Sequence, residues 1–444
     1  MSVGKDRQGF KLVILSNLSQ TKETSIPDDW LVKRIDEIGE KDPETIDESK
    51  YEYSEIEYID IGAIADFKIT KTEKISLKDR PSRAQKIVRK DDIIISTVRP
   101  YLMSFTTIDN ETKNLVCSTG FAVIRAKDSV LSQLIFSNTQ SHHFNTQMIR
   151  LMQGSNYPAV TSDIVGNVMI PYPPDKEERE KIASILSNVD AQMQQTQKLI
   201  DLTQRLKKGL MQKLLTRGIG HTKFKKVKWY FGKDIEIPEE WQIITFKQLI
   251  TNGPSSGLYS PEENYGTGDK IVGLGDVFRS EILQTNGMKK VKLSERQKNR
   301  SILKSHDLVF SRYSLKFEGV GKCLYIPKLT ETILFESNTL RVSTNMHLVN
   351  SRYLGYYFNT GFGRVSIIRI LKQVSATGIT GTDLKNTLLV LPNDIEEQQK
   401  IASILSNVDE QIQQHKNEKA LLERIKNGLM QQILTGQRRV KVGV

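Results

Sequence analysis

The residue patterns that most often carry chemistry are incomplete in this chain. An amino-methyltransferase would show an Asn-Pro-Pro-Tyr or Asp-Pro-Pro-Tyr turn, but Pro171-Tyr172-Pro173-Pro174-Asp175 has these residue types in another order. No Gly-x-x-x-x-Gly-Lys-Ser/Thr phosphate loop occurs, and Gly273-Leu274-Gly275 lacks the third glycine of a dinucleotide-binding turn. The six histidines form no His-x-x-x-His pair that could hold a metal ion. The sequence therefore predicts a protein without a catalytic or metal site of its own.

Charge and cysteine usage indicate the class of protein instead. The net charge of +12 and the isoelectric point near 9.3 favour a polyanionic partner, although a basic protein without such a partner is the alternative. Cys117 and Cys323 lie far apart, and neither an apolar run of about 18 residues nor a signal peptide is visible. We therefore expect a cytoplasmic protein without disulfide bonds. Two basic clusters are either solvated linkers or phosphate contacts: Lys223, Lys225, Lys226 and Lys228, and Arg438, Arg439 and Lys441.

The chain contains an internal repeat. Residues 181–190, Lys-Ile-Ala-Ser-Ile-Leu-Ser-Asn-Val-Asp, recur letter for letter at 400–409, and we call the difference in residue number between the two copies the repeat offset. The alignment continues without a gap to Thr216 and Thr435, and 22 of its 36 positions are identical. Both copies lack proline and are rich in Gln, Leu, Ile and Lys, which predicts two long helices.

The segments that precede these helices match more faintly. Ile26-Pro27-Asp28-Asp29-Trp30 opens the first, and Ile237-Pro238-Glu239-Glu240-Trp241 opens the second. Each is predicted to be an α+β domain of about 150 residues, with short strands that share a framework. Strands are expected at 59–64, 91–96, 272–277 and 306–311, and helical patches at 130–145 and 351–360. The resulting boundaries are an N-terminal segment at 1–25, a domain at 26–174, a helix at 175–217, a basic linker at 218–236, a domain at 237–393, a helix at 394–436 and a basic tail at 437–444.

Each long helix has start signals and an apolar seam. Asp175 and Asp394 can serve as N-caps, and apolar residues then recur at steps of three and four, the heptad spacing of a coiled coil. Gly209 and Gly428, at the same place in both helices, indicate close helix packing or a kink. The helices can pair antiparallel and relate the two domains by a pseudo-twofold axis; the alternative is that each packs only on its own domain. The expected seam is Ile182, Leu186, Val189, Met193, Thr196, Ile200, Thr203, Leu206, Leu210 and Leu214, and Ile401, Leu405, Val408, Ile412, His415, Leu422, Ile425, Leu429 and Ile433.

With these features the chain resembles the specificity (S) subunits of type I restriction–modification enzymes. The resemblance rests on the paired Ile-Pro-x-x-Trp segments, the repeated decapeptide at 181–190 and 400–409, and Gly-Leu-Met-Gln at Gly209 and Gly428. It covers nearly the whole chain and implies an α+β fold, in which two target recognition domains of mixed α/β structure are separated by helices that form an antiparallel coiled coil. One departure is that Asn156-Tyr157-Pro158 is not matched by Ala376-Thr377-Gly378.

The resemblance also implies a function. Each recognition domain would bind one half of an asymmetric, bipartite site on double-stranded DNA, and the coiled coil would set the gap between the halves. Two modification (methyltransferase) subunits and restriction (ATP-dependent nuclease and translocase) subunits would be the partners. S-adenosylmethionine, ATP and magnesium would be bound by those partners, so we expect no cofactor on this chain, which would be a non-catalytic subunit.

Loop residues with suitable side chains are the candidate DNA contacts. Arginine and lysine pair with guanine edges, and asparagine and glutamine pair with adenine. The alternative for each candidate is a surface residue that hydrogen-bonds within its own domain. The candidates are Arg99, Tyr101, Gln153, Ser155, Asn156 and Tyr157 in the first domain, and Arg312, Tyr313, Lys316, Lys372, Gln373 and Ser375 at matching positions in the second.

Two other functions stay open from the sequence. A stand-alone DNA-binding coiled-coil scaffold or regulator would not co-purify with methyltransferase chains. A catalytic DNA methyltransferase or nuclease would act on DNA without a partner, but the missing motifs disfavour it.

Overall fold

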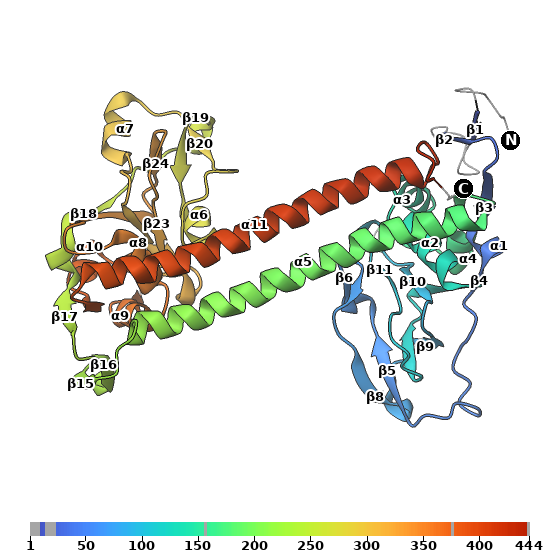
Figure 1. The fold of residues 1–444 in the computed structure, drawn as a ribbon, viewed down its shortest axis with the longest axis horizontal. Coiled ribbons are helices and arrows are strands. Elements are labelled where there is room, and N and C mark those ends of the chain that lie inside the picture. Colours follow the sequence, from blue (N-terminus) through green and yellow to red (C-terminus); the bar gives the residue numbers. More distant parts are fainter. Residues whose placement is uncertain (1–8, 14–23, 155–157, 374–376, 442–444) are drawn as a thin grey trace. The chain divides into compact units, whose positions relative to one another are not determined.

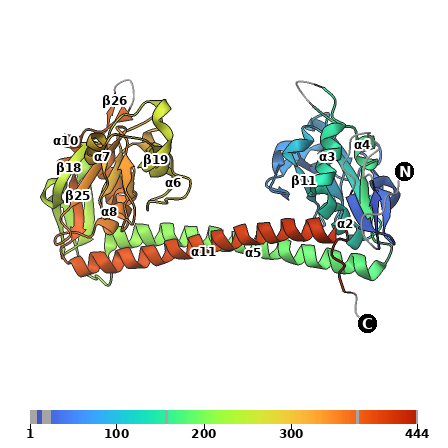
Figure 2. The same ribbon diagram turned by 90° about the horizontal axis from the view of Figure 1, so that it is seen from above.

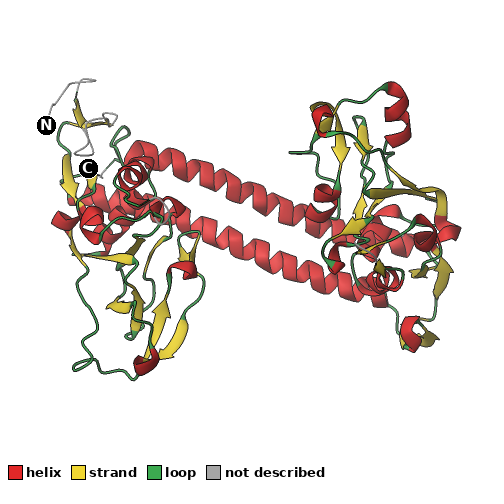
Figure 3. Ribbon diagram, turned by 180° about the vertical axis from the view of Figure 1, so that it is seen from behind, coloured by secondary structure: helices red, strands yellow, loops and turns green. Residues whose placement is uncertain are grey.

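The computed structural model describes residues 9–13, 24–154, 158–373 and 377–441. The chain forms two compact units, Met1–Gln197 together with Asn417–Val444, and Lys198–Lys416. Each unit contains one globular domain and one half of each of two long helices, α5 (Lys176–Arg217) and α11 (Ile395–Ile433), which are green and red in Figure 1. The strands, yellow in Figure 3, belong to the globular domains. None of the described helices is long and apolar enough to cross a membrane.

The first domain is built on two four-stranded sheets. One has the antiparallel order β11-β10-β13-β4, and the other, β8-β5-β12-β9, includes the parallel pair β5 and β12. Strands β10 and β13 contribute buried apolar side chains to both faces of the first sheet and so lie at the centre of the core. The strands are β1 (Phe10–Val13), β2 (Thr24–Pro27), β3 (Leu31–Arg34), β4 (Gly39–Lys41), β5 (Glu55–Ile59), β6 (Ile64–Ala65), β7 (Lys68–Ile69), β8 (Glu73–Ser76), β9 (Ala84–Ile87), β10 (Ile93–Ser96), β11 (Phe105–Thr107), β12 (Leu115–Ser118), β13 (Phe121–Ala126) and β14 (Met169–Tyr172); the helices are α1 (Ile35–Ile38), α2 (Ser129–Thr139), α3 (His142–Arg150) and α4 (Ser162–Gly166).

The second domain repeats this framework. Its sheets have the orders β18-β25-β21-β23 and β20-β19-β24, and β19 and β24 again form a parallel pair. Strands β21 and β25 occupy the places of β10 and β13, with buried side chains on both faces. The elements are β15 (Phe224–Lys228), β16 (Asp234–Pro238), β17 (Trp241–Thr245), β18 (Ile250–Ser256), β19 (Tyr265–Val272), α6 (Leu274–Arg279), β20 (Lys290–Val291), α7 (Glu295–Ser301), β21 (Leu308–Ser311), β22 (Tyr313–Ser314), β23 (Cys323–Tyr325), β24 (Ile333–Phe335), β25 (Thr339–Thr344), α8 (Ser351–Phe358), α9 (Gly361–Arg369), β26 (Lys372–Gln373), β27 (Thr377–Gly378), α10 (Gly381–Lys385) and β28 (Leu388–Pro392).

The helical patch expected at 130–145 is confirmed, and it consists of two helices because the Ser141 hydroxyl accepts the Phe144 N–H at 3.3 Å and so caps the start of α3. Two other local predictions are wrong. The strands expected at 59–64 and 272–277 end at their first residue and continue as helical turns. In the second domain the Asp276 carboxylate accepts the Gly273 N–H at 3.0 Å, which stabilises the turn against an extended backbone.

Both long helices begin where the sequence predicts. Asp175 Oδ1 accepts a hydrogen bond from Glu177 N at 3.1 Å, and Asp394 Oδ1 accepts one from Glu396 N at 2.8 Å. These aspartates satisfy backbone N–H groups that the start of a helix leaves without a partner, which confirms the two predicted N-caps.

In the first unit α5 and α11 run antiparallel. Lys426 Nζ donates to Asp190 Oδ1 at 2.5 Å, and Lys419 Nζ donates to Gln197 Oε1 at 2.9 Å. Residue numbers therefore rise along one helix as they fall along the other.

The second unit contains the same pairing. Lys207 Nζ lies 2.7 Å from Asp409 Oδ1, and Asp409 also accepts a hydrogen bond from Tyr356 of α8 at 2.6 Å. Asp409 follows Asp190 by the repeat offset, and Lys426 follows Lys207 by the same offset, so one inter-helix ion pair occurs twice. The predicted α+β fold class, with two domains, an internal repeat and antiparallel long helices, is confirmed.

The seams pack against each other and against the adjacent domain. In the first unit Ile182 and Leu186 share an apolar cluster with Ile433 of α11 and with Leu134 of α2. Figure 2 shows α2 against the two long helices in this unit. In the second unit α8 takes the place of α2. Each helix thus packs on its own domain and also on the other helix. Of the predicted seam, Ile182, Leu186, Leu214, Ile401, Leu405, Val408, Ile412 and Ile433 are buried, and Val189, Met193, Leu210 and Leu429 are half-buried.

Four residues contradict the packing predicted for the long helices. Leu206 and Ile425 are 54% and 43% exposed, so neither lies between the helices. A Cβ added at Gly209 or Gly428 would meet no atom within 4 Å, so the glycines do not serve close packing of α5 against α11. Together with two leucines that are each 49% exposed, these residues form what we call the exposed stripes: Leu202, Leu206 and Gly209 on α5, and Leu421, Ile425 and Gly428 on α11.

A glutamate near the start of each long helix accepts a hydrogen bond from the tryptophan that opens the adjacent domain. Glu178, 1% exposed, accepts a hydrogen bond from Trp30 Nε1 at 3.1 Å and two from the Arg439 guanidinium at 2.6 and 2.8 Å. Arg439 also contacts Asp29 at 2.9 Å. The tail residue Arg439 is therefore neither a solvated linker nor a phosphate contact, as the sequence suggested, but an ion-pair partner of the first domain.

The second unit uses a histidine at the same place. Glu397 accepts a hydrogen bond from Trp241 Nε1 at 3.3 Å and from Ile219 N at 3.0 Å, and His221 Nε2 lies 2.9 Å from the same carboxylate. Glu397 follows Glu178 by the repeat offset. The segment after each long helix thus contacts the equivalent glutamate near the start of the other long helix.

We expect Arg439→Ala to lower the stability of the first unit by about 2 kcal/mol, because it leaves the buried Glu178 carboxylate without its cation. The Arg439 side chain is 46% exposed, and for this reason the expected cost lies below that of a fully buried pair. Native-state hydrogen exchange of α2 measures the loss. Arg438→Ala, at the exposed neighbouring residue, is the matched control. Equal effects of the two changes would contradict the assigned role.

Candidate nucleic-acid interface

The first candidate loop follows the central strand β10. Thr97 N donates to Gly120 O at 2.8 Å, and the backbone then turns sharply, with Arg99 at φ +48° and Met103 at φ +52°. Leu102 N donates to Arg99 O and Met103 N donates to Pro100 O, each at 2.9 Å. Left-handed backbone is uncommon outside glycine, and such residues gather at functional sites. The 97–103 loop exposes Arg99 and Tyr101, as the candidate contacts require.

A second segment of the first domain lies against this loop. Gln153 and Ala159 exchange two backbone hydrogen bonds of 2.9 Å, Val160 N donates to Thr97 O at 2.8 Å, and Arg99 N donates to Pro158 O at 2.8 Å. Arg99, Tyr101 and Gln153 are therefore brought to one place. The candidates Ser155, Asn156 and Tyr157 lie outside the described residues.

The second domain brings its candidates together in the same way. Ile379 N donates to Arg312 O at 3.0 Å, and the three-stranded sheet β22-β27-β26 pairs Tyr313 with Gly378 and Gly378 with Lys372. Gln373 pairs with Thr377 in that sheet, and Lys316 follows in the 312–319 loop. Ser375 lies outside the described residues.

The backbone pairing corrects one correspondence between the domains. The sequence matched Arg312 with Arg99, but the bond from Ile379 N to Arg312 O is the counterpart of the bond from Val160 N to Thr97 O. The two arginines therefore differ by two positions along the loop. Arg312 stacks on Tyr313, with 4.9 Å from the guanidinium carbon to the ring centroid, and its Nε is buried without a hydrogen-bond partner among the described residues.

One helix position supports the loop in both domains, although no local sequence pattern indicated it. The Arg364 guanidinium of α9 donates to three carbonyls of the 317–320 turn: Val320 at 2.6 Å, Glu318 at 2.9 Å and Phe317 at 3.3 Å. Burial lowers the pKa of Arg364, and Glu318 opposes that shift. Asn145 of α3, which precedes Arg364 by the repeat offset, places its Nδ2 3.1 Å from Met103 Sδ in the first loop. The repeat offset was the signal that could have identified this pair.

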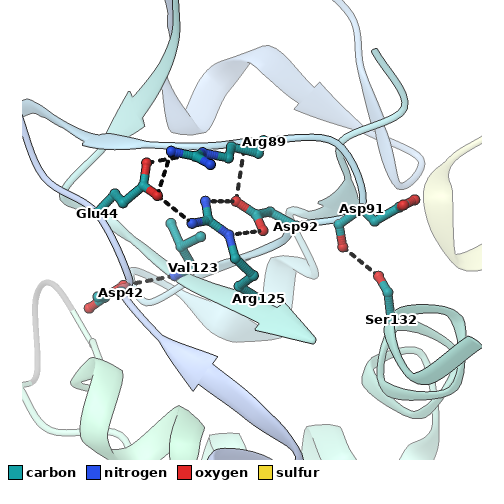
Figure 4. Close-up of polar contacts among 8 residues, drawn as sticks. All are labelled: Asp42, Glu44, Arg89, Asp91, Asp92, Val123, Arg125 and Ser132. Atoms are coloured by element: carbon teal, nitrogen blue, oxygen red, sulfur yellow. Dashed lines mark hydrogen bonds and ion pairs between the residues drawn. The ribbon is translucent and has the colours of Figure 1, made fainter. Parts of the chain in front are cut away.

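Buried carboxylates fix the strands that carry the two loops. Asp92, 1% exposed, accepts the Arg89 N–H at 2.8 Å and a bidentate pair from Arg125 at 2.8 and 2.7 Å (Figure 4). Glu44 holds both guanidinium groups from the other side, at 2.7 Å from Arg125 and 2.8 Å from Arg89. The hydrogen bonds to Asp92, with help from Glu44, raise the pKa of Arg125.

The second domain contains the aspartate without the arginine. Asp307 accepts the Lys304 N–H at 2.8 Å, as Asp92 accepts that of Arg89, but its other oxygen accepts the Ser343 hydroxyl at 2.5 Å. Ser343 lies on β25 where Arg125 lies on β13. Burial raises the pKa of Asp307, and the hydrogen bonds from Ser343 and Lys304 only partly offset it.

The described residues include no group of three or more His, Cys, Asp or Glu side chains placed to hold a metal ion. Cys117 and Cys323 are free and fully buried, and burial raises the pKa of both thiols. Neither thiol is poised as a nucleophile.

Comparison with known proteins identifies the family. A model for the type I restriction modification DNA specificity domain matches residues 27–204 and again residues 238–424. The chain belongs to this family. It is a DNA specificity subunit of the type I restriction–modification class, and the comparisons favour this function over that of a methyltransferase. Each match spans one globular domain and much of the long helix that follows it in sequence.

Relatives of this specificity subunit align along most of its length. The MjaVIII specificity subunit of Methanocaldococcus jannaschii is 26% identical over 454 residues, which cover 96% of each chain. The EcoKI specificity subunit of Escherichia coli is 25% identical over 293 residues, 64% of this chain and 60% of the relative.

Solved structures share the fold. A chain from a study of complex assembly and conformational transition of the type I R-M system has a TM-score of 0.52 at 24% identity, with 93% of this chain and 99% of that chain covered. The S subunit of a type I restriction–modification system from M. genitalium has a TM-score of 0.56 at 12% identity, with 91% and 96% covered.

Proposed function

We propose that this specificity subunit is non-catalytic and that each of its domains binds one half of a bipartite target on double-stranded DNA. The observation that carries the proposal is that backbone pairing gathers the candidate side chains at the same place in both domains. Arg99, Tyr101 and Gln153 meet at the 97–103 loop, and Arg312 and Tyr313 meet at the 312–319 loop.

The chemistry of these side chains suits base and phosphate contacts. An arginine can donate two hydrogen bonds to guanine O6 and N7, and a glutamine can pair with adenine N6 and N7. Lys316 is exposed beside Tyr313 and fits a phosphate contact, which positions the protein without specifying sequence. The net charge of +12 favours association with the polyanion in a salt-dependent way.

The exposed stripes support the proposed partners. A mid-helix glycine costs about 1 kcal/mol relative to alanine, yet each long helix has one on its exposed face beside a leucine or isoleucine. Such a surface lets the helix of another subunit approach closely. Because the stripe occurs once on α5 and once on α11, we infer two modification subunits per chain, with restriction subunits joining them. S-adenosylmethionine, ATP and magnesium would be bound by those subunits.

We expect that exchange of residues 26–172 for the corresponding domain of another specificity subunit changes one half of the target and leaves the other half intact. The two domains have separate cores, and so each should recognise its half-site independently. The target is measured by mapping methylated adenines genome-wide in cells that contain the modification subunits. The reciprocal exchange of 237–391 is the matched control. A change of both halves by one exchange would contradict the proposal, as would methylation by the chain alone.

A further inference from the structure

Each candidate loop presents a leucine to solvent. Leu315 in the 312–319 loop has a relative exposure of 102%, the value of a side chain with nothing packed against it, and Leu102 in the 97–103 loop is 61% exposed. Each follows an arginine by three residues, Arg312 and Arg99 respectively. A single exposed leucine is common on protein surfaces and needs no explanation. Both candidate loops nevertheless present one, although backbone pairing places Leu315 two positions away from the counterpart of Leu102.

The structure holds these leucines firmly in their exposed positions. On one side of Leu315, Tyr313 and Ser314 pair with β27, and on the other side the Arg364 guanidinium binds the turn that begins at Phe317. Lys316 N donates to Ser314 Oγ at 3.1 Å across the leucine itself. The backbone around Leu315 therefore has little freedom left to lose when a ligand covers the side chain, which favours binding through it.

The first loop holds its leucine by other means. Leu102 ends a short turn that starts at the buried Pro100 and closes with the Met103 N–H on Pro100 O. Asn145 contacts Met103 from α3 at the helix position of Arg364 in the second domain. The two domains thus use different bonds and present the same kind of side chain.

We propose that Leu315 and Leu102 are wedges that insert between neighbouring base pairs, one in each half-site. The inference rests on the proposed function, since it assigns a contact within the same DNA interface. Apolar side chains flanked by cations partly unstack a base step in this way, and the cost of unstacking is offset by phosphate contacts and by burial of the wedge. Lys316 and Arg99 lie close enough in sequence to supply such contacts.

The wedges would add specificity without a hydrogen bond to a base. Pyrimidine–purine steps such as TA and CA/TG unstack most easily, so each half-site should favour one of them where the leucine enters. The two halves can then share a step preference while the arginine, glutamine and lysine contacts differ.

The test uses the chain assembled with its modification subunits. A bipartite duplex is first selected from a randomised 40-base-pair library, and 2-aminopurine, which brightens when unstacked, is then placed at successive positions of that duplex. Leu315→Ala should abolish the fluorescence rise at one step of one half-site and weaken binding roughly 10- to 100-fold. Leu102→Ala should do the same in the other half only. Leu315→Met should retain both signals.

Two features separate the wedge from other effects. A methyltransferase extrudes its target base, and this signal should persist in every variant as an internal reference. Lys316→Ala should lower the salt dependence of binding while the unstacking signal remains. Because Leu315 is wholly exposed, its alanine variant should keep the wild-type melting temperature.

Several outcomes would overturn the wedge. One is unaltered fluorescence in both alanine variants, and another is a response to thymine→uracil replacement without unstacking, which would assign a methyl contact. Loss of modification subunits from the Leu315→Ala complex would assign the leucine to a protein interface instead. Failure of the proposed function looks different, because no bipartite duplex would then be enriched.

Discussion

Asp92→Asn is expected to destabilise the first unit by about 3–5 kcal/mol, whereas Asp307→Asn should cost the second unit less than about 1 kcal/mol. The two aspartates occupy the same place before β10 and β21, and each accepts the backbone N–H of the residue three positions earlier, at 2.8 Å. The difference lies in the partner of the remaining carboxylate oxygens.

Asparagine cannot replace Asp92 without loss. Both carboxylate oxygens accept hydrogen bonds, from Arg125 Nε and Nη2 and from the Arg89 N–H, so an amide NH₂ at either position would face a donor. The change also leaves the Arg125 guanidinium, 22% exposed, with Glu44 as its remaining carboxylate partner. At Asp307 the amide can donate to the Ser343 hydroxyl, which accepts as readily as it donates, while its oxygen keeps the Lys304 N–H.

The pH dependence should also distinguish the second unit. Burial raises the folded-state pKa of Asp307 above its ordinary value, so the native state holds this proton more tightly than the unfolded chain does. The contribution of Asp307 to stability is then fully present below the ordinary aspartate pKa of about 3.9 and is lost as the pH rises through the folded value. Wild-type protein should therefore lose stability relative to Asp307→Asn over that window.

Domain-resolved measurement is needed for both variants, since a chain of two units does not unfold in one step. Native-state hydrogen exchange of β10 and β13 follows the first unit, and exchange of β21 and β25 follows the second. Comparable losses in the two variants would show that the Arg125 pair contributes nothing beyond burial of the carboxylate.

The sequence predicted those features that depend on local pattern. The long helices follow from their proline-free heptads, and Asp175 and Asp394 are caps because their carboxylates meet backbone N–H groups only two residues away. The repeat offset located both domains, and with them the loops that follow β10 and β21. The strand pattern alone placed the arginine–tyrosine candidates at those loops.

What the sequence could not predict depends on which face of an element is covered. The expected seam contained Leu206, yet the structure instead pairs the ammonium of the neighbouring Lys207 with Asp409 and Glu281. Burial is the largest single influence on the pKa of Lys207 and lowers it, but the two carboxylates together outweigh burial and raise the pKa. Leu206 consequently turns outward.

Contacts distant in sequence were missed for a related reason. Glu178 has the position of an ordinary helix-start acid, and nothing local indicates that it turns inward to Trp30 and to a tail arginine 261 residues away. The same holds for Arg364, whose three acceptors lie 44–47 residues earlier. Tertiary packing selects these partners. Only the internal repeat, which relates equivalent positions in the two copies, could have indicated these residues from the sequence.

Leu206→Glu is expected to remove one modification subunit from the complex and to leave the other bound. Leu206 is 54% exposed on α5, and its counterpart Ile425 is 43% exposed on α11, each one turn from a second exposed leucine and one turn from an exposed glycine. A carboxylate desolvated at the centre of an apolar helix contact costs several kcal/mol, which corresponds to a loss of affinity of at least about 100-fold.

Because there are two exposed stripes, each variant is expected to bind a definite number of modification subunits. Wild-type chain should bind two modification subunits, Leu206→Glu and Ile425→Glu one each, and the double variant none, as measured by native mass spectrometry of the assembled complex. Asn188→Glu and Asn407→Glu are matched controls, because both asparagines are exposed on the same helices and are also related by the repeat offset. Each lies 14 residues before the first leucine of its stripe, so both subunits should remain bound.

The single variants test whether each copy of the repeat binds its own modification subunit. If Leu206→Glu removed both subunits, the two stripes would form one composite site, and the inference of one partner per stripe would be wrong. Retention of both subunits by the double variant would mean that the exposed stripes do not bind the modification subunits. Because each exposed side chain contributes nothing to its own core, folding should be unaffected in every variant, and unchanged hydrogen exchange of α2 and α8 confirms that any lost subunit reflects the interface itself.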